Sequence, residues 1–176
     1  TVSGITAENK VYDGNTDATL SCTNASFDGR IGNDELTVTA VGTFAEKDAG
    51  ANKTVNITNL TLGGSSANNY KLADNGQQGT ATASITAKLL TVTAENQTKD
   101  AGASHPELTF TADGLISGES FTGTLSRGEG ESVGTYSITQ GTLSAGGNYT
   151  INFTQGTFTI QRDLNLSLGA DRKWAT

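Results

Sequence analysis

Apolar and polar residues alternate along almost the whole chain, and this period of two constrains the fold more than any other sequence feature. Alternation is typical of strands with one buried and one solvated face, as in antiparallel sheets. Threonine, the usual polar partner here, suits a pleated surface because it is β-branched. The clearest segments are ELTVTAV (35–41), LLTVTAEN (89–96), ELTFTAD (107–113) and NYTINFTQGTFTI (148–160). Glycine-rich turns separate the runs and no long helical period occurs, so the sequence predicts a mostly β protein.

Five landmarks occur twice in the same order, which indicates an internal repeat. The pairs are TAEN (6–9 and 93–96), GNDELTVT with GESFTGT (32–39 and 118–124), DAGANKTVNIT with SVGTYSIT (48–58 and 132–139), SSANNYKL with SAGGNYTI (65–72 and 144–151), and GTATASI with GTFTI (79–85 and 156–160). The sequence therefore predicts two tandem small antiparallel-sheet domains, β-grasp-like or sandwich-like. Their bounds are 1–86 and 87–161, with 162–176 as a tail or the start of the next module.

The predicted junction, ITAK at 85–88, has no loose linker. A unit of this size buries only about 60–65% of the surface that its unfolded chain exposes, so a close seam with a neighbouring unit would add needed burial. We therefore expect an elongated, monomeric rod, on the order of 60–70 Å long, whose partners are neighbouring repeats of the same polypeptide.

Charge and composition exclude several classes of function. The net charge of -7 excludes a nucleic-acid partner, because phosphate binding needs a basic surface. No apolar run approaches the roughly 20 residues that span a bilayer, so no membrane insertion is expected. Cys22 has no second cysteine to pair with and alternates in phase with Leu20, as a small buried hydrophobic residue does. The chain lacks methionine and a signal segment, which indicates a piece of a longer polypeptide.

The stretch KVYDG (10–14) follows the short segment ITAEN, and NNYKL and GTATASIT come some seventy residues later. In this arrangement the first copy resembles the YDG repeat. The second copy resembles the MBG repeat through ITAKLLTVTAENQTK, a PELTF strand, GLISGES, SVGTYSIT, GNYTI and GTFTI. It departs from that pattern where Ala101-Gly102 stands in place of a Tyr-Gly pair, and where His105 precedes Pro106 in place of an asparagine.

The resemblance implies a role outside the cell. Such repeats occur in tandem in large bacterial surface and secreted proteins, including filamentous-haemagglutinin-like adhesins exported by two-partner secretion. It thus implies a non-catalytic stalk or spacer module of a cell-surface, biofilm-type adhesin. The alternative hypothesis is a module that binds host or matrix carbohydrate through Tyr12 and the acidic turn beside it.

Asp13, Asn15 and Asp17 have the spacing of the first ligands of a calcium loop. An EF-hand loop also needs glycine at its sixth position and glutamate at its twelfth, where Ala18 and Asn24 stand. We therefore interpret KVYDGNTDATL as a structural turn in which Asp13 accepts a backbone N–H bond and the next glycine has positive φ. These three residues stay weak metal candidates, and no cofactor is expected.

Other conspicuous side chains also have a structural interpretation. Tyr70 and Tyr149 occupy equivalent places in the two copies, which favours packing over sugar stacking. Tyr12 and Trp174 have no such counterpart, so they are the candidates for ligand contact. Carboxylate neighbours such as Glu129 and Glu131 lie on predicted turns without an apolar pocket, and no enzyme is expected.

Overall fold

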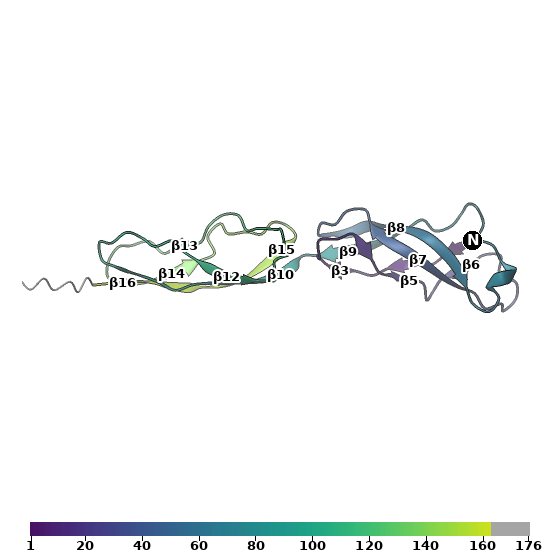
Figure 1. Ribbon diagram of the computed structural model, residues 1–176, viewed down its shortest axis with the longest axis horizontal. Helices are drawn as coiled ribbons and strands as arrows, with labels where there is room; N and C mark the ends of the chain where they lie inside the picture. Colours follow the sequence, from purple (N-terminus) through teal and green to yellow (C-terminus); the bar gives the residue numbers. More distant parts are fainter. Residues whose placement is uncertain (163–176) are drawn as a thin grey trace, which may run out of the picture. The chain divides into compact units, whose positions relative to one another are not determined.

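The structure is a computed structural model that describes residues 1–162. Nearly all of its regular structure is β-strand (Figure 1), which confirms the predicted fold class. A short 3-10 turn, η1 (Ala67–Asn69), is the only helical element among the described residues. No helix in residues 1–162 is long and apolar enough to cross a membrane.

The chain divides into two compact units that do not follow the order of the sequence. The first unit contains Thr1–Leu90, Gly114–Ser120 and Ala145–Ile151. The second contains Thr91–Asp113, Phe121–Ser144 and the chain from Asn152 onward. Two short segments late in the chain therefore belong to the same unit as its beginning, and this brings distant side chains together.

The first unit is built on a five-stranded sheet. Its strands, in spatial order, are β3 (Lys10–Val11), β9 (Thr80–Thr86), β8 (Gly50–Gly63), β7 (Thr37–Phe44) and β4 (Asp17–Ala18). Four short strands form two further antiparallel pairs: β1 (Val2–Ser3) with β6 (Ser26–Phe27), and β2 (Thr6–Ala7) with β5 (Leu20–Ser21). Figure 1 shows β7 and β8 as the long strands of this unit, in accord with their bounds.

The short pairs and the large sheet share one apolar core. Val2 and Ile5 come from the chain around the short strands, whereas Val38 and Ile57 come from β7 and β8. All four are buried and form one cluster, and Cys22 packs against it half-buried, as its alternation predicts. This unit is therefore sandwich-like, with the alternating residues of two layers facing each other.

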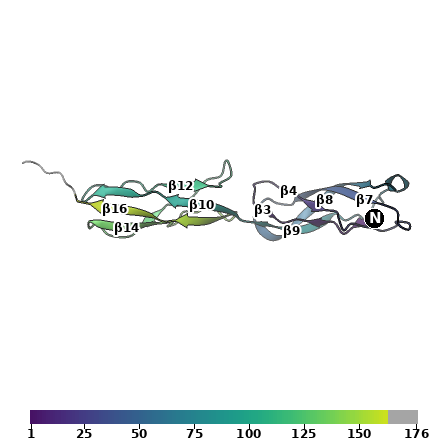
Figure 2. The ribbon, with the colours of Figure 1, turned by 90° about the horizontal axis from the view of Figure 1, so that it is seen from below.

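The second unit contains a four-stranded sheet and most of a three-stranded one. The first is ordered β11 (Gln97–Asp100), β16 (Gly156–Gln161), β14 (Gly134–Thr139), β13 (Ser126–Arg127), and the second β12 (Phe110–Asp113), β10 (Lys88–Ala94), β15 (Tyr149–Thr154). The strands of this unit lie nearly along one common axis, some pointing one way and some the other (Figure 2). Leu90, Val92 and Ala94 of β10 are all buried, and the threonines between them are exposed, as the period of two predicts.

The two large sheets repeat one strand order. In each, the strand that bears the lysine, β3 or β11, runs parallel to the last strand of the repeat, β9 or β16, with Lys10 opposite Ile85 in one sheet and Lys99 opposite Ile160 in the other. The next strands, β8 and β14, pair antiparallel with that last strand. The sheets are therefore mixed, whereas alternation alone predicted antiparallel pairing. Alternation reports which face of a strand is buried, and it does not report strand direction.

Candidate functional site

The stretch KVYDGNTDATL forms the predicted turn between β3 and β4. The Asn15 N–H donates to Asp13 Oδ1 at 3.2 Å, and the Asp17 N–H donates to Asn15 Oδ1 at 2.9 Å. Gly14 has φ +81°, a conformation that side-chain-bearing residues rarely adopt. The hydrogen bonds and this φ confirm the interpretation of the stretch as a structural turn.

The side-chain oxygens of this turn also surround a lysine. Lys10 Nζ lies 2.7 Å from Asp13 Oδ1 and donates to Asn15 Oδ1 at 2.9 Å. Desolvation by itself would raise the pKa of the Asp13 carboxyl, but the bonds from Lys10 and Asn15 outweigh it and lower that pKa. Two of the three calcium candidates thus already serve an ammonium group. Within residues 1–162 no group of three or more His, Cys, Asp or Glu side chains is placed to hold a metal ion.

Tyr12 takes part in a cluster of two phenols and one carboxylate within the first unit. Its hydroxyl donates to Glu119 Oε1 at 2.5 Å, and the Tyr149 hydroxyl donates to Glu119 Oε2. The two rings meet edge to face with centroids 5.5 Å apart, which is a favourable aromatic geometry. Segments 107 residues apart in sequence therefore meet at one carboxylate.

This cluster fixes the charge state of its members. The hydrogen bond to Glu119, followed by burial, raises the pKa of Tyr12 to about 12. Burial and then Glu119 raise the pKa of Tyr149, and the two phenols lower the pKa of the Glu119 carboxyl. At neutral pH both tyrosines are thus neutral donors and Glu119 is an ionised acceptor.

The position of Tyr12 corrects one sequence-based hypothesis. Only 1% of Tyr12 is exposed, so its ring offers no face to a ligand and its hydroxyl does not lie at the surface. The hypothesis of an exposed contact failed because the carboxylate partner of Tyr12 lies more than a hundred residues away, beyond the reach of local pattern. The other contact candidate, Trp174, lies outside the described residues.

Tyr70 and Tyr149 have the same bonding pattern. The Tyr70 hydroxyl accepts from the Ile31 N–H at 2.9 Å and donates to Asp34 Oδ2 at 2.7 Å. Tyr149 accepts from the Ile116 N–H at 3.2 Å and donates to Glu119. In each case the acid follows the isoleucine by three residues in a hydrogen-bonded turn. We refer to these groups as the first tyrosine–acid turn (Ile31, Asp34, Tyr70) and the second tyrosine–acid turn (Ile116, Glu119, Tyr149).

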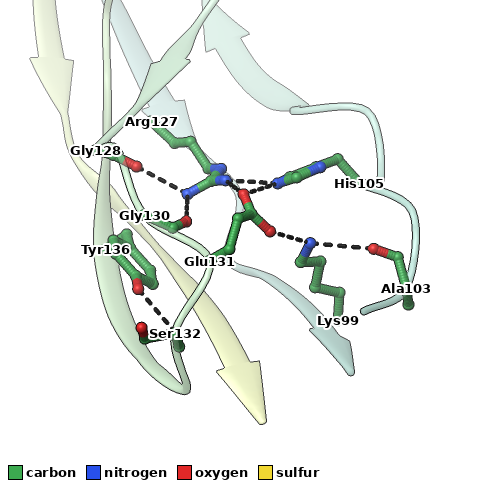
Figure 3. Close-up of polar contacts among 9 residues, drawn as sticks. All are labelled: Lys99, Ala103, His105, Arg127, Gly128, Gly130, Glu131, Ser132 and Tyr136. Carbon is green, nitrogen blue, oxygen red and sulfur yellow. Dashed lines mark hydrogen bonds and ion pairs between the residues drawn. The ribbon is translucent and has the colours of Figure 1, made fainter. Parts of the chain in front are cut away.

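The second unit contains a charged cluster that sequence reasoning missed (Figure 3). Lys99 is buried, with 7% exposed, and its Nζ donates to Glu131 Oε2 at 2.6 Å and to the Ala103 carbonyl at 3.0 Å. The other oxygen of Glu131 binds the Arg127 guanidinium and lies 3.0 Å from His105 Nε2. The bond from Lys99 is the main cause that lowers the pKa of the Glu131 carboxyl.

Aromatic rings contact the arginine and the histidine of this cluster. The Arg127 guanidinium lies 5.0 Å from the Phe158 ring centroid and 5.4 Å from that of Tyr136, within cation–π range. The His105 ring stacks on Phe158 at 5.7 Å. A buried lysine needs a counter-charge, and an arginine over two rings is well suited to hold that carboxylate in place. The cluster thus ties the loops at 103–105 and 127–131 to β11 and β16.

The sequence contains the residues of this cluster, but no local pattern connects them. Lys99 and Lys10 sit opposite equivalent isoleucines, so the repeat could have suggested a second half-buried lysine. In the sequence, Glu131 stands out only as one of a pair of carboxylates on a predicted turn. No local spacing connects Lys99 to a glutamate thirty-two residues later.

Comparison with known families assigns both halves of the chain. Residues 1–82 match the YDG domain, and residues 90–159 match the MBG domain of the YGX type. The chain therefore contains a YDG domain followed by an MBG domain. Comparison with curated proteins and with solved structures found no match. The boundaries expected from the repeat, 1–86 and 87–161, stay a prediction.

Proposed function

We propose that this tandem is a structural stalk or spacer module of an extracellular bacterial adhesin, of the filamentous-haemagglutinin-like kind exported by two-partner secretion. It extends or supports an adhesive region at the cell surface and performs no catalysis. The observation that carries the proposal is the presence of a YDG and an MBG domain in one chain, each contributing a sheet with the same strand order.

The internal hydrogen bonds and ion pairs of the polar side chains support a structural role. The carboxylates of Glu119 and Glu131 and the turn oxygens of Asp13 are all engaged by internal donors. A ligand site instead combines an exposed apolar or aromatic surface with convergent polar groups. Since Tyr12 is buried, no observation favours the carbohydrate-binding alternative through this residue.

The strand order supports a load-bearing role. In both sheets the strand that bears the lysine, near the beginning of the repeat, pairs in parallel with the last strand of that repeat, over Lys10–Val11 with β9 and over Gln97–Asp100 with β16. When two parallel neighbours are pulled toward opposite ends, their hydrogen bonds are loaded together in shear. A stalk module needs this resistance to extension.

The spacer function is tested by exchange within the parent protein. Residues 1–162 are replaced by two unrelated β modules of similar length, and surface display and adhesion are measured. We expect adhesion to be retained at equal display. Adhesion lost at equal display, together with binding of the full chain to a glycan array, would overturn the proposal in favour of the carbohydrate-binding alternative.

A further inference from the structure

The first tyrosine–acid turn has one member fewer than the second. Glu119 accepts one phenol on each carboxylate oxygen, from Tyr149 and from Tyr12. Asp34 accepts the Tyr70 phenol on Oδ2, and among the described residues no side chain donates to its Oδ1. The same backbone turn thus presents a fully used acceptor in one copy and a half-used acceptor in the other.

The isoleucine of each turn shows the same difference. Ile116 is half-buried and lies beside the Tyr12–Gly14 turn, where a Cβ on Gly14 would be 3.5 Å from Ile116 Cγ2. Its counterpart Ile31 is 75% exposed. The surface that covers Ile116 therefore has no counterpart over Ile31 within residues 1–162.

A hollow lies next to the first tyrosine–acid turn. Tyr70 lines it together with five apolar side chains and four polar or charged ones. The apolar residues are Val2, Phe27, Leu36, Leu62 and Leu72, and the polar or charged ones are Thr1, Asp28, Arg30 and Lys71. On the second turn the space against Tyr149 is filled by the ring of Tyr12. A hollow lined by both apolar and polar side chains, beside a half-used carboxylate, suits an aromatic ring that carries a hydroxyl.

We propose that the first tyrosine–acid turn is the docking surface for the tyrosine-bearing strand end of another module of the same kind, one that precedes this chain in its polypeptide. That tyrosine donates to Asp34 Oδ1 and packs against Tyr70, and the glycine turn that follows it covers Ile31. This inference rests on the proposed spacer function, which supplies the preceding module. It deepens that function by naming the surface and the partner.

The second unit of another copy lacks the required group. Its strand β11 is in register with β3 of the first unit, because the Ala101 N–H donates to Gln161 O at 2.8 Å as the Tyr12 N–H donates to Thr86 O at 2.8 Å. Alanine thus occupies the place of the phenol. The occupant must be a module that keeps a tyrosine at this position, as the YDG domain of this chain does.

The test extends the full chain at its beginning with an additional copy of residues 1–87 that carries Tyr70→Phe, so that Tyr12 is the only tyrosine added. This second Tyr12 then precedes Thr1 by the same number of residues as Tyr12 precedes Lys88 in the natural chain. Phenol ionisation is followed by ultraviolet absorbance, and hydrogen exchange of the Ile31 amide by NMR. We expect one additional tyrosine with a pKa near the value of about 12 held by Tyr12, and at least about tenfold slower exchange at Ile31.

Two variants of the downstream copy separate docking from general stability. Asp34→Asn should return the additional phenol to an ordinary pKa, whereas the matched control Asp74→Asn, at a carboxylate that is 86% exposed, should leave it raised. An additional phenol that titrates near pH 10 in the extended chain, or equal effects of the two variants, overturns the proposal. Concentration-dependent protection of Ile31 in the unextended chain also overturns it, since the surface would then bind a second copy. Adhesion enters none of these measurements, so failure here is distinct from failure of the spacer function.

Discussion

The two repeats place a lysine at the same point of two equivalent sheets but neutralise it differently. Lys10 is held by its own turn, through Asp13 and Asn15, whereas Lys99 is held by Glu131 from a distant hairpin. The residue three positions after Lys10 is Asp13, and the residue three positions after Lys99 is a glycine. Where the turn lacks a carboxylate, another loop supplies it. A buried ammonium requires a counter-charge, and the source of that charge is interchangeable.

The aromatic residue beside the lysine differs as well. Phe44 of β7 lies 5.6 Å from Lys10 Nζ, whereas Phe158 of β16 supports Arg127 and His105. In the first repeat, one aromatic ring and one turn are thus enough to hold the lysine. In the second repeat, the carboxylate comes from a distant loop, and the Phe158 ring positions Arg127 and His105 beside it.

Removal of these rings should produce the largest effect. Phe44 and Phe158 are 1% and 0% exposed, and Phe→Ala in a core costs about 3–5 kcal/mol of the free energy of unfolding. We expect Phe158→Ala to cost more than Phe44→Ala, because it also removes the support of Arg127. Urea denaturation followed by residue-resolved hydrogen exchange measures both. Equal costs would show that the charged cluster does not depend on its ring.

Valine at the turn glycines should have the next largest effect. Gly14 and Gly102 have nearly the same φ, +81° and +82°, but only Gly14 has a neighbour, Ile116, near the place of a Cβ. Strain at such a position costs about 1–3 kcal/mol. Gly14→Val should therefore destabilise the protein more than Gly102→Val in thermal melts. The reverse order would show that the contact with Ile116 does not matter.

Removal of a phenol hydroxyl should have a smaller effect, and it should differ between Tyr12 and Tyr70. Tyr12→Phe removes a hydrogen bond from a buried phenol to a carboxylate, which is worth about 1.5–3 kcal/mol. Tyr70→Phe removes the corresponding bond at a more exposed turn, so a smaller loss in urea denaturation is expected. A larger loss for Tyr70→Phe would show that burial of the phenol does not set the strength of this hydrogen bond.

Alkaline pH should weaken the first unit in particular. The pKa of Tyr12 is raised from 10.0 to about 12, so its contribution to stability is complete below pH 10 and is lost as pH rises through about 12. The melting temperature should fall over this window, and less steeply in Tyr12→Phe. An unchanged slope in this variant would show that another group causes the alkaline loss.

Calcium should have the smallest effect. Since Lys10 occupies the oxygens of Asp13 and Asn15, added Ca²⁺ has no preformed site to stabilise, and the melting temperature should stay constant. A rise of several degrees that Asp13→Ala and Asp17→Ala abolish would show that the turn is a metal site.

Local pattern predicted the features that depend on neighbouring residues. The alternation in LLTVTAEN placed Leu90, Val92 and Ala94 on the buried face. The turn at Asp13–Asn15 followed from the short reach of its side chains. The likeness of Tyr70 and Tyr149 was visible in the repeat, although the structural equivalence of Ile31 with Ile116 is one residue out of register with the repeat landmarks GNDEL and GESF.

By itself, the sequence determined that this chain is a tandem of β modules, because a period of two and an ordered repeat are properties of neighbouring residues. Only the tertiary structure decided that Tyr12 is buried, that Glu119 joins two phenols, and that Glu131 pairs with Lys99. The reason is physical. A phenol or an ammonium group in a core needs a partner wherever the chain can bring one, and hydrogen bonding and charge do not depend on distance along the sequence.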